Sequence, residues 1–198
     1  MSRVLKQKYL SRRTKEVTTQ FTDALLFQGK EFSIIEMDDE INKLAQDFVT
    51  PDDFGMRGRM TSTANRRGFS AAYELVDETL RLRSFGLCER NGSYLPIGGI
   101  LPQVESDSSY GRYNCLNLLV EFTGTVRIAA GWNKDPTARR TKTRMEPPFP
   151  YTKVIDLKLI KGRLVSTTDQ LALAGGNVES LVPIGPSSQA LMRYLESL

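Results

Sequence analysis

The sequence contains no histidine, only two cysteines and no long apolar run, and each absence excludes a class of function. Without histidine the chain can build neither a Ser-His-Asp nor a Cys-His nucleophilic centre, and no histidine-ligated zinc site. Two cysteines are too few for a four-cysteine zinc or iron–sulfur cluster within one chain. Catalysis would therefore depend on carboxylates, Lys, Arg or Tyr, with or without an oxygen-ligated cation.

The scarcity of cysteine and the lack of apolar segments also bear on where the protein works. Cys88 and Cys115 are expected to be reduced, buried thiols rather than a disulfide framework, which favours the cytoplasm. The basic N-terminus is not followed by an apolar stretch, so we expect no signal peptide. No apolar run reaches the roughly 18 residues of a membrane span. We therefore expect a cytoplasmic protein without a membrane partner.

The net charge of +4 is unevenly distributed along the chain. Residues 1–15 hold six basic side chains and no acidic one, which leaves 21 basic against 23 acidic residues in the rest. The body is therefore close to neutral and carries a basic leader. Such a leader is either a solvated tail or an arm that contacts nucleic acid or an acidic partner, and we favour the tail.

Apolar runs that flank short turns predict β-hairpins along most of the chain. The expected pairs are 24–27 with 31–35, 69–76 with 79–83, 116–122 with 125–129, and 154–160 with 163–166. In the second strand of the second pair, residues 79–83, apolar and basic residues alternate strictly, which is typical of a half-buried strand with its arginines facing water. The fold class is therefore expected to be mainly β: an antiparallel sheet or partly open barrel built from sequential hairpins, with short terminal helices.

The hairpins suggest a single domain with two different ends. We expect residues 1–20 to form a basic N-terminal arm or short helix, and residues 21–170 a β-rich core domain. Residues 171–198 are expected to be a Gly/Pro/Ser-rich connection and a C-terminal helix. Within the core, the middle of the acidic stretch 36–53 has apolar residues at helical spacing, from Ile41 to Phe48, and predicts a short amphipathic helix that ends before Pro51. Residues 89–102 are expected to be irregular.

One motif resembles a known family. The segment Ser62-Thr63-Ala64-Asn65-Arg66-Arg67-Gly68-Phe69, followed by a hairpin, resembles the Ser-Thr-Ala-x-x-Arg-Gly-aromatic motif of a β-rich bacterial family with no established activity. Blocks 122–128 and 156–165 are similar to that family as well. Asn65 and Arg66 depart from it, because a Cys or Trp and an aromatic residue are expected there. The resemblance implies a β-rich fold and a bacterial origin, and leaves function open.

The Gly- and Arg-rich segment 55–68, which overlaps this motif, carries the strongest candidate site. Guanidinium groups on such a glycine-containing loop bind phosphate or carboxylate in a bidentate manner. The alternative is that Arg67 pairs with a structural acid such as Glu74 or Asp52 while the other arginines are solvated. No phosphate-binding loop motif is present. The candidate binding residues here are Arg57, Arg59, Arg66 and Arg67.

A second basic patch lies at 134–144, directly after the single tryptophan. Basic side chains beside an aromatic residue are typical of a single-stranded nucleic-acid groove. The alternative is an exposed loop with the tryptophan packed in the core. The candidate residues are Trp132, Lys134, Arg139, Arg140, Lys142 and Arg144.

Carboxylates within the predicted strands offer a third possibility. Any two of Glu74, Glu121 and Asp156 would form an acid/base pair or hold a divalent cation if they converged inside a barrel, although strand alternation turns many such acids outward. The acidic stretch 36–53 is either a solvated face or a surface for a protein partner.

These observations favour binding over catalysis. We expect a non-enzymatic interaction module of a bacterial cytoplasmic protein, of the toxin-neutralising or defence-associated kind, with no catalytic residue, metal or cofactor. A protein is the expected partner, and the sequence leaves the oligomeric state open. The first alternative is a nucleic-acid-binding accessory protein that uses segments 1–15, 57–67 and 134–144. The second is an enzyme that works through strand carboxylates.

Overall fold

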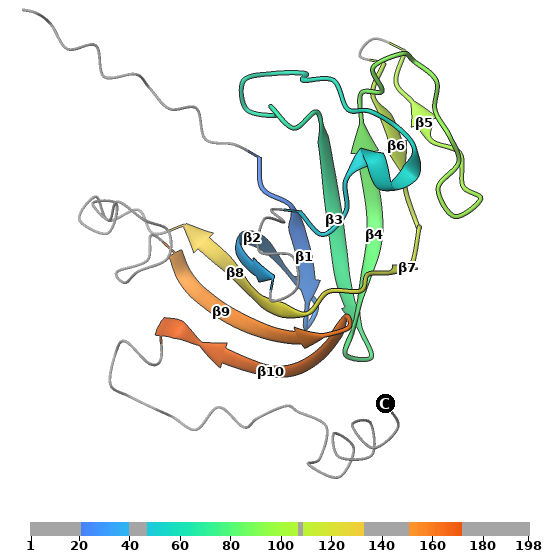
Figure 1. The fold of residues 1–198 in the computed structure, drawn as a ribbon. Coiled ribbons are helices and arrows are strands. Elements are labelled where there is room, and N and C mark those ends of the chain that lie inside the picture. Colours follow the sequence, from blue (N-terminus) through green and yellow to red (C-terminus); the bar gives the residue numbers. More distant parts are fainter. Residues whose placement is uncertain (1–20, 40–46, 107–108, 133–150, 172–198) are drawn as a thin grey trace, which may run out of the picture.

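The computed structural model describes residues 21–39, 47–106, 109–132 and 151–171. Over this part of the chain ten strands form one sheet, which closes into a seven-stranded barrel (Figure 1). The described residues also include a short 3₁₀ helix, and Gln170 and Leu171 after the last strand are helical. The elements are β1 Ala24–Phe27, β2 Lys30–Asp39, η1 Pro51–Phe54, β3 Phe69–Val76, β4 Thr79–Leu87, β5 Gln103–Val104, β6 Gly111–Tyr113, β7 Leu118–Leu119, β8 Gly124–Trp132, β9 Tyr151–Ile160 and β10 Arg163–Asp169.

The strand order of the sheet is β10-β9-β8-β2-β1-β3-β4-β6-β5, and a further pairing between β10 and β4 closes the barrel. All pairings are antiparallel except that of β1 with β3, which run in the same direction. The mainly β prediction, with a sheet or barrel as its architecture, is confirmed. The expected terminal helices fall within residues 1–20 and 172–198 and lie outside the described residues.

Three of the four predicted hairpins are present, each with a two-residue turn. The turns are Gln28-Gly29, Asp77-Glu78 and Lys161-Gly162, and all six residues have positive φ values between 47° and 77°. Positive φ at both central positions is the backbone of a type I′ turn, whose twist matches that of the strands it joins. These hairpins are therefore fixed by local sequence.

The tips of two hairpins meet where the barrel closes, and the contact is made by backbone groups. The N–H of Leu80 donates to the carbonyl of Gly162 at 2.7 Å, and the N–H of Gly162 donates to the carbonyl of Phe122 at 2.8 Å. The N–H of Leu164 completes the seam by donating to the carbonyl of Glu78 at 2.7 Å. We call this junction the hairpin seam.

The remaining hairpin prediction is wrong. Segments 116–122 and 125–129 do not pair with each other, because β7 pairs with β4 while β8 lies between β2 and β9. The stretch expected to be irregular is followed by β5 and β6, which extend the sheet beyond β4. The first residues of the acidic stretch, up to Asp39, continue β2, and the helix expected in its middle falls mostly on residues 40–46, outside the described residues.

The barrel interior is filled by alternate residues of the strands. Leu80, Leu82, Val126 and Leu157 are at most 1% exposed, whereas Arg83 on the other face of β4 is exposed. Alternation of this kind places one face of each strand in the core and the other toward solvent. No helix in the described residues is both long enough and apolar enough to cross a membrane.

Candidate binding groove

A groove of about 820 Å³ lies between the loop that follows η1 and the β5–β6 extension. Its walls include Phe21, Arg59, Met60, Asn65, Tyr110 and Arg112. Phe21 and Met60 are 64% and 59% exposed, which is high for large apolar side chains. The volume falls within the range of about 300–1,000 Å³ that is usual for ligand sites. The groove therefore combines basic, polar and apolar surface at a size suited to a ligand.

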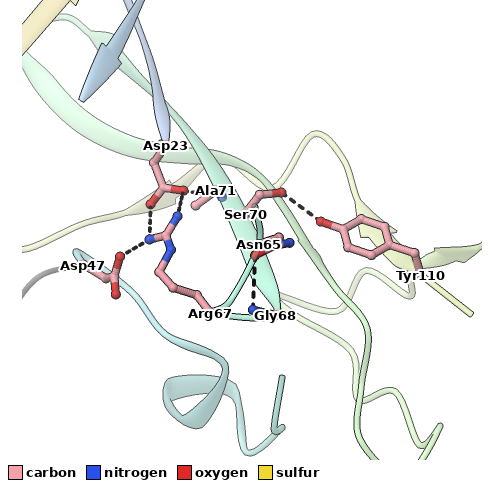
Figure 2. A network of polar contacts seen from close by, with 8 residues as sticks. All are labelled: Asp23, Asp47, Asn65, Arg67, Gly68, Ser70, Ala71 and Tyr110. Atoms are coloured by element: carbon pink, nitrogen blue, oxygen red, sulfur yellow. Dashed lines mark hydrogen bonds and ion pairs between the residues drawn. The ribbon is translucent and has the colours of Figure 1, made fainter. Parts of the chain in front are cut away.

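Arg67 forms ion pairs with two acidic residues from other parts of the chain, Asp23 and Asp47 (Figure 2). We call these three residues the clasp. Its two terminal nitrogens donate to the carboxylate of Asp23 at 2.8 and 3.2 Å, and one of them also donates to Asp47. Asp23 is only 7% exposed and accepts a further bond from the N–H of Ala71 at 3.0 Å. The clasp joins the start of β1, the segment before η1 and the start of β3.

The pKa values in the clasp show how burial and charge compete. Burial alone would lower the pKa of Arg67, but hydrogen bonds and attraction from Asp23 and Asp47 outweigh it and raise that pKa. Burial raises the pKa of Asp47, and attraction to Arg67 only partly opposes it. Arg67 thus remains a permanent cation that ties loops together, and it is not one of the residues that line the groove.

Two tight turns between Ser62 and Gly68 present Asn65 to the groove. The N–H of Asn65 donates to the side chain and the carbonyl of Ser62, each at 3.1 Å. The N–H of Gly68 donates to Oδ1 of Asn65 at 3.1 Å. Gly68 has φ of 76°, and a Cβ there would overlap the backbone of Arg59. In this segment Ser62 therefore accepts a bond within the turn, Arg67 forms the ion pairs, and Gly68 provides the positive φ and the close approach to Arg59.

Tyr110 forms the opposite part of the groove. Its ring covers Gly86 of β4, where a Cβ would clash with it, and its hydroxyl lies 2.8 Å from that of Ser70 on β3 (Figure 2). Burial raises the pKa of Tyr110, while the bond to Ser70 opposes that rise. The phenol is therefore held in its neutral form at neutral pH.

Two arginines supply positive charge to the groove. Nη2 of Arg59 donates to the sulfur of Cys88 at 3.1 Å, and this bond raises the pKa of Arg59. Arg112 lies 3.6 Å from Glu105, and both side chains are more than half exposed. An exposed pair of this kind is worth little in water, so Arg112 remains available to a ligand.

The structure separates the four candidate arginines. Arg59 lines the groove, and Arg67 is structural, although its partners are Asp23 and Asp47 and not the expected Glu74 or Asp52. Arg57 and Arg66 are exposed and do not line the groove.

The second basic patch cannot be placed against the first. Lys134, Arg139, Arg140, Lys142 and Arg144 lie outside the described residues, as does segment 1–15, and Trp132 is described only as the last residue of β8. The expected burial of both cysteines is correct for Cys88 and wrong for Cys115, which is exposed.

The strand carboxylates do not converge in the way an acid/base pair would require. Glu121 is exposed, and Glu74 lies in a separate depression with Arg81 and Arg83. Asp156 accepts two bonds from Arg127, at 2.6 and 2.8 Å, in a depression of about 180 Å³. That depression is smaller than the roughly 300 Å³ at which ligand pockets usually begin.

Arg127 also donates to Glu36 at 3.0 Å, so it links β2, β8 and β9 across the outer face of the barrel. Burial raises the pKa of Glu36, and the attraction of Arg127 opposes this rise. In the described part of the chain, no three His, Cys, Asp or Glu residues are placed to hold a metal ion.

Sequence reasoning missed most of the groove. Asn65 was singled out only as a departure from the family motif, and Ser70, Tyr110 and Arg112 were assigned no role. In β6, Gly111 and Tyr113 are buried and Arg112 between them is exposed. This alternation is the sequence signal from which the strand could have been predicted. Comparison of the chain with known protein families, with curated proteins and with solved structures finds no match, so the family resemblance stays a prediction.

Proposed function

We propose that this chain is a non-enzymatic binding module of the bacterial cytoplasm, which holds an acidic segment of a partner protein in the groove. The observation that carries the proposal is the lining of the groove, where Arg59 and Arg112 stand beside the exposed Phe21 and Met60. Basic groups give electrostatic complementarity to an acidic segment, and apolar side chains bury surface against it. A toxin-neutralising or defence-associated role is the narrower form of this proposal.

The groove supports a protein ligand better than nucleic acid. Among its lining residues, two arginines face one glutamate, so the lining carries a net charge of only +1. Binding of a nucleic acid rests on several phosphate contacts, each of which requires a cation. An acidic segment that also carries apolar side chains fits this mixture better.

The test is recovery of a partner from the native host with charge-reversed variants as controls. We expect a stoichiometric partner to be retained by the wild type and lost from Arg59→Glu and Arg112→Glu, because each variant repels an acidic segment. Arg83→Glu is the matched control, since Arg83 is exposed on β4 and outside the groove. The purified partner should then rebind the wild type with the same dependence on the two arginines.

Two results would overturn the proposal. Equal recovery of the partner by all four proteins would exclude the groove as its binding site. Retention of the wild type on labelled oligonucleotides at low salt, with no protein partner recovered, would favour the nucleic-acid alternative.

A further inference from the structure

Asn65 holds an unused hydrogen-bond donor on the wall of the groove. The residue is 9% exposed, and its Oδ1 accepts the bond from Gly68. That bond fixes the orientation of the amide, so Nδ2 points away from Gly68, on the side of Tyr110 (Figure 2). Nδ2 donates to no group in the described part of the chain.

Nδ2 of Asn65 is not among the buried atoms that lack a partner, and Asn65 lines the groove, so this donor reaches the space in which a ligand would lie. An acceptor on a ligand that enters the groove can therefore take the place of water at this donor. The position of Asn65 is also over-determined, because its backbone and its Oδ1 are both bonded within the turn. The donor is therefore held in place before any ligand arrives.

The guanidinium of Arg59 belongs to the same wall. The backbone of Arg59 packs against Gly68, the residue whose N–H bonds Asn65. Its N–H is bonded to the carbonyl of Cys88 at 2.8 Å, and its side chain reaches the sulfur of the same residue. Arg59 and Asn65 are thus anchored through one loop, and both line the groove.

We propose that Asn65 and Arg59 together bind a carboxylate of the partner, supplied by an aspartate or glutamate side chain. The two oxygens of a carboxylate accept one bond from Nδ2 of Asn65 and one from the guanidinium of Arg59. Phe21 and Met60 contact the apolar neighbours of that residue, and Arg112 adds attraction from the opposite wall. This assignment rests on the proposed function and names Asn65 as its specificity-determining residue.

The test uses a fluorescein-labelled peptide that alternates glutamate and serine around a central leucine, with fluorescence anisotropy as the readout. The same peptide with glutamine in place of glutamate is the first comparison, and a labelled oligothymidylate is the second. Asn65→Asp keeps the oxygen that accepts from Gly68 but replaces the donor with a second carboxylate oxygen. We expect it to weaken binding of the glutamate peptide at least about tenfold. Asn114→Asp, an exposed asparagine outside the groove, is the matched control and should bind as the wild type does.

A second measurement on the wild type guards against misfolding of the variant. The side-chain amide resonances of Asn65 in a ¹H–¹⁵N spectrum should shift on addition of the glutamate peptide and stay in place with the glutamine peptide. Unchanged resonances with bound glutamate peptide would overturn the role of Asn65.

The remaining outcomes separate this inference from the proposed function. If Arg59→Glu loses the glutamate peptide while Asn65→Asp binds it as the wild type does, the groove function stands and the Asn65 assignment falls. If no protein in the series binds the glutamate peptide, both fall. Preference for oligothymidylate over the glutamate peptide would overturn the carboxylate site in favour of nucleic acid.

Discussion

The barrel is held together in two places by two different means. At the hairpin seam, backbone groups of Leu80, Phe122 and Gly162 bond to one another. Beside the groove, the charged side chains of Arg67, Asp23 and Asp47 hold the chain segments together. The seam depends on the conformation of a turn, whereas the clasp depends on buried charge. We therefore expect the free energy of unfolding to respond differently to substitutions at the seam and at the clasp, and, of the two, only the clasp to contribute a dependence on pH.

Substitution at the seam should have the largest effect. Gly162 has φ of 77°, and a Cβ there would overlap the carbonyl oxygen of Val120. We expect Gly162→Ala to lower the free energy of unfolding by at least about 3 kcal/mol, measured by urea denaturation, because strain and overlap add. Gly29→Ala is the matched control: its φ is 72°, but its surroundings are open, so about 1 kcal/mol is expected. Equal losses would show that the overlap is relieved by a shift of Val120.

Removal of the clasp should have the next largest effect. Arg67→Met leaves Asp23 and Asp47 next to each other without their cation, which we expect to lower the free energy of unfolding by about 2 kcal/mol. The loss is smaller than for a fully buried pair because Arg67 is 29% exposed and water can replace part of its interaction. Arg57→Met, at an exposed arginine of the same loop, should change stability by less than about 0.5 kcal/mol. A similar loss in both variants would argue against the clasp as a structural element.

The pH dependence of stability should show the smallest effect, but it should distinguish the clasp from the hairpin seam most clearly. The pKa of Asp47 is raised above its ordinary 3.8 by burial, so the folded state binds more protons than the unfolded chain at pH values above 3.8. Stability from this group therefore falls as pH rises through that window. Asp47→Asn removes the titrating group, so the wild type should lose stability relative to the variant from pH 3.8 upward, followed by urea midpoints. Gly162→Ala should differ from the wild type by a constant amount instead; two parallel curves for Asp47→Asn would contradict the raised pKa.

The contrast between the local seam turns and the long-range clasp also explains which parts of the fold the sequence could predict. The hairpins were accessible because Gln28-Gly29 and Lys161-Gly162 sit between alternating apolar runs, and their geometry is decided within a few residues. The partners of Arg67 were not accessible, because Asp23 and Asp47 lie 44 and 20 residues away and only the closed barrel brings them together. Asp52 and Glu74 are nearer to Arg67 in the sequence, but nearness in sequence does not determine nearness in the barrel.

The groove was predicted only in part for the same reason. Arg59 could be singled out because arginines on a glycine-rich loop stand out in composition. Asn65 could not be recognised as a donor, since its role depends on the turn that commits its oxygen to Gly68. Tyr110 reaches the groove only because glycine at position 86 leaves room for its ring, a relation between β4 and the segment before β6.

The single parallel pairing of the barrel has a consequence for the order of folding. The three hairpins close over two-residue turns and can form early, whereas β1 and β3 must come together from distant parts of the chain. Asp23 directly precedes β1 and bonds to Ala71 of β3, 48 residues away, so the clasp forms only once that pairing is made. A ligand that binds the groove would select chains in which this non-local pairing is already made.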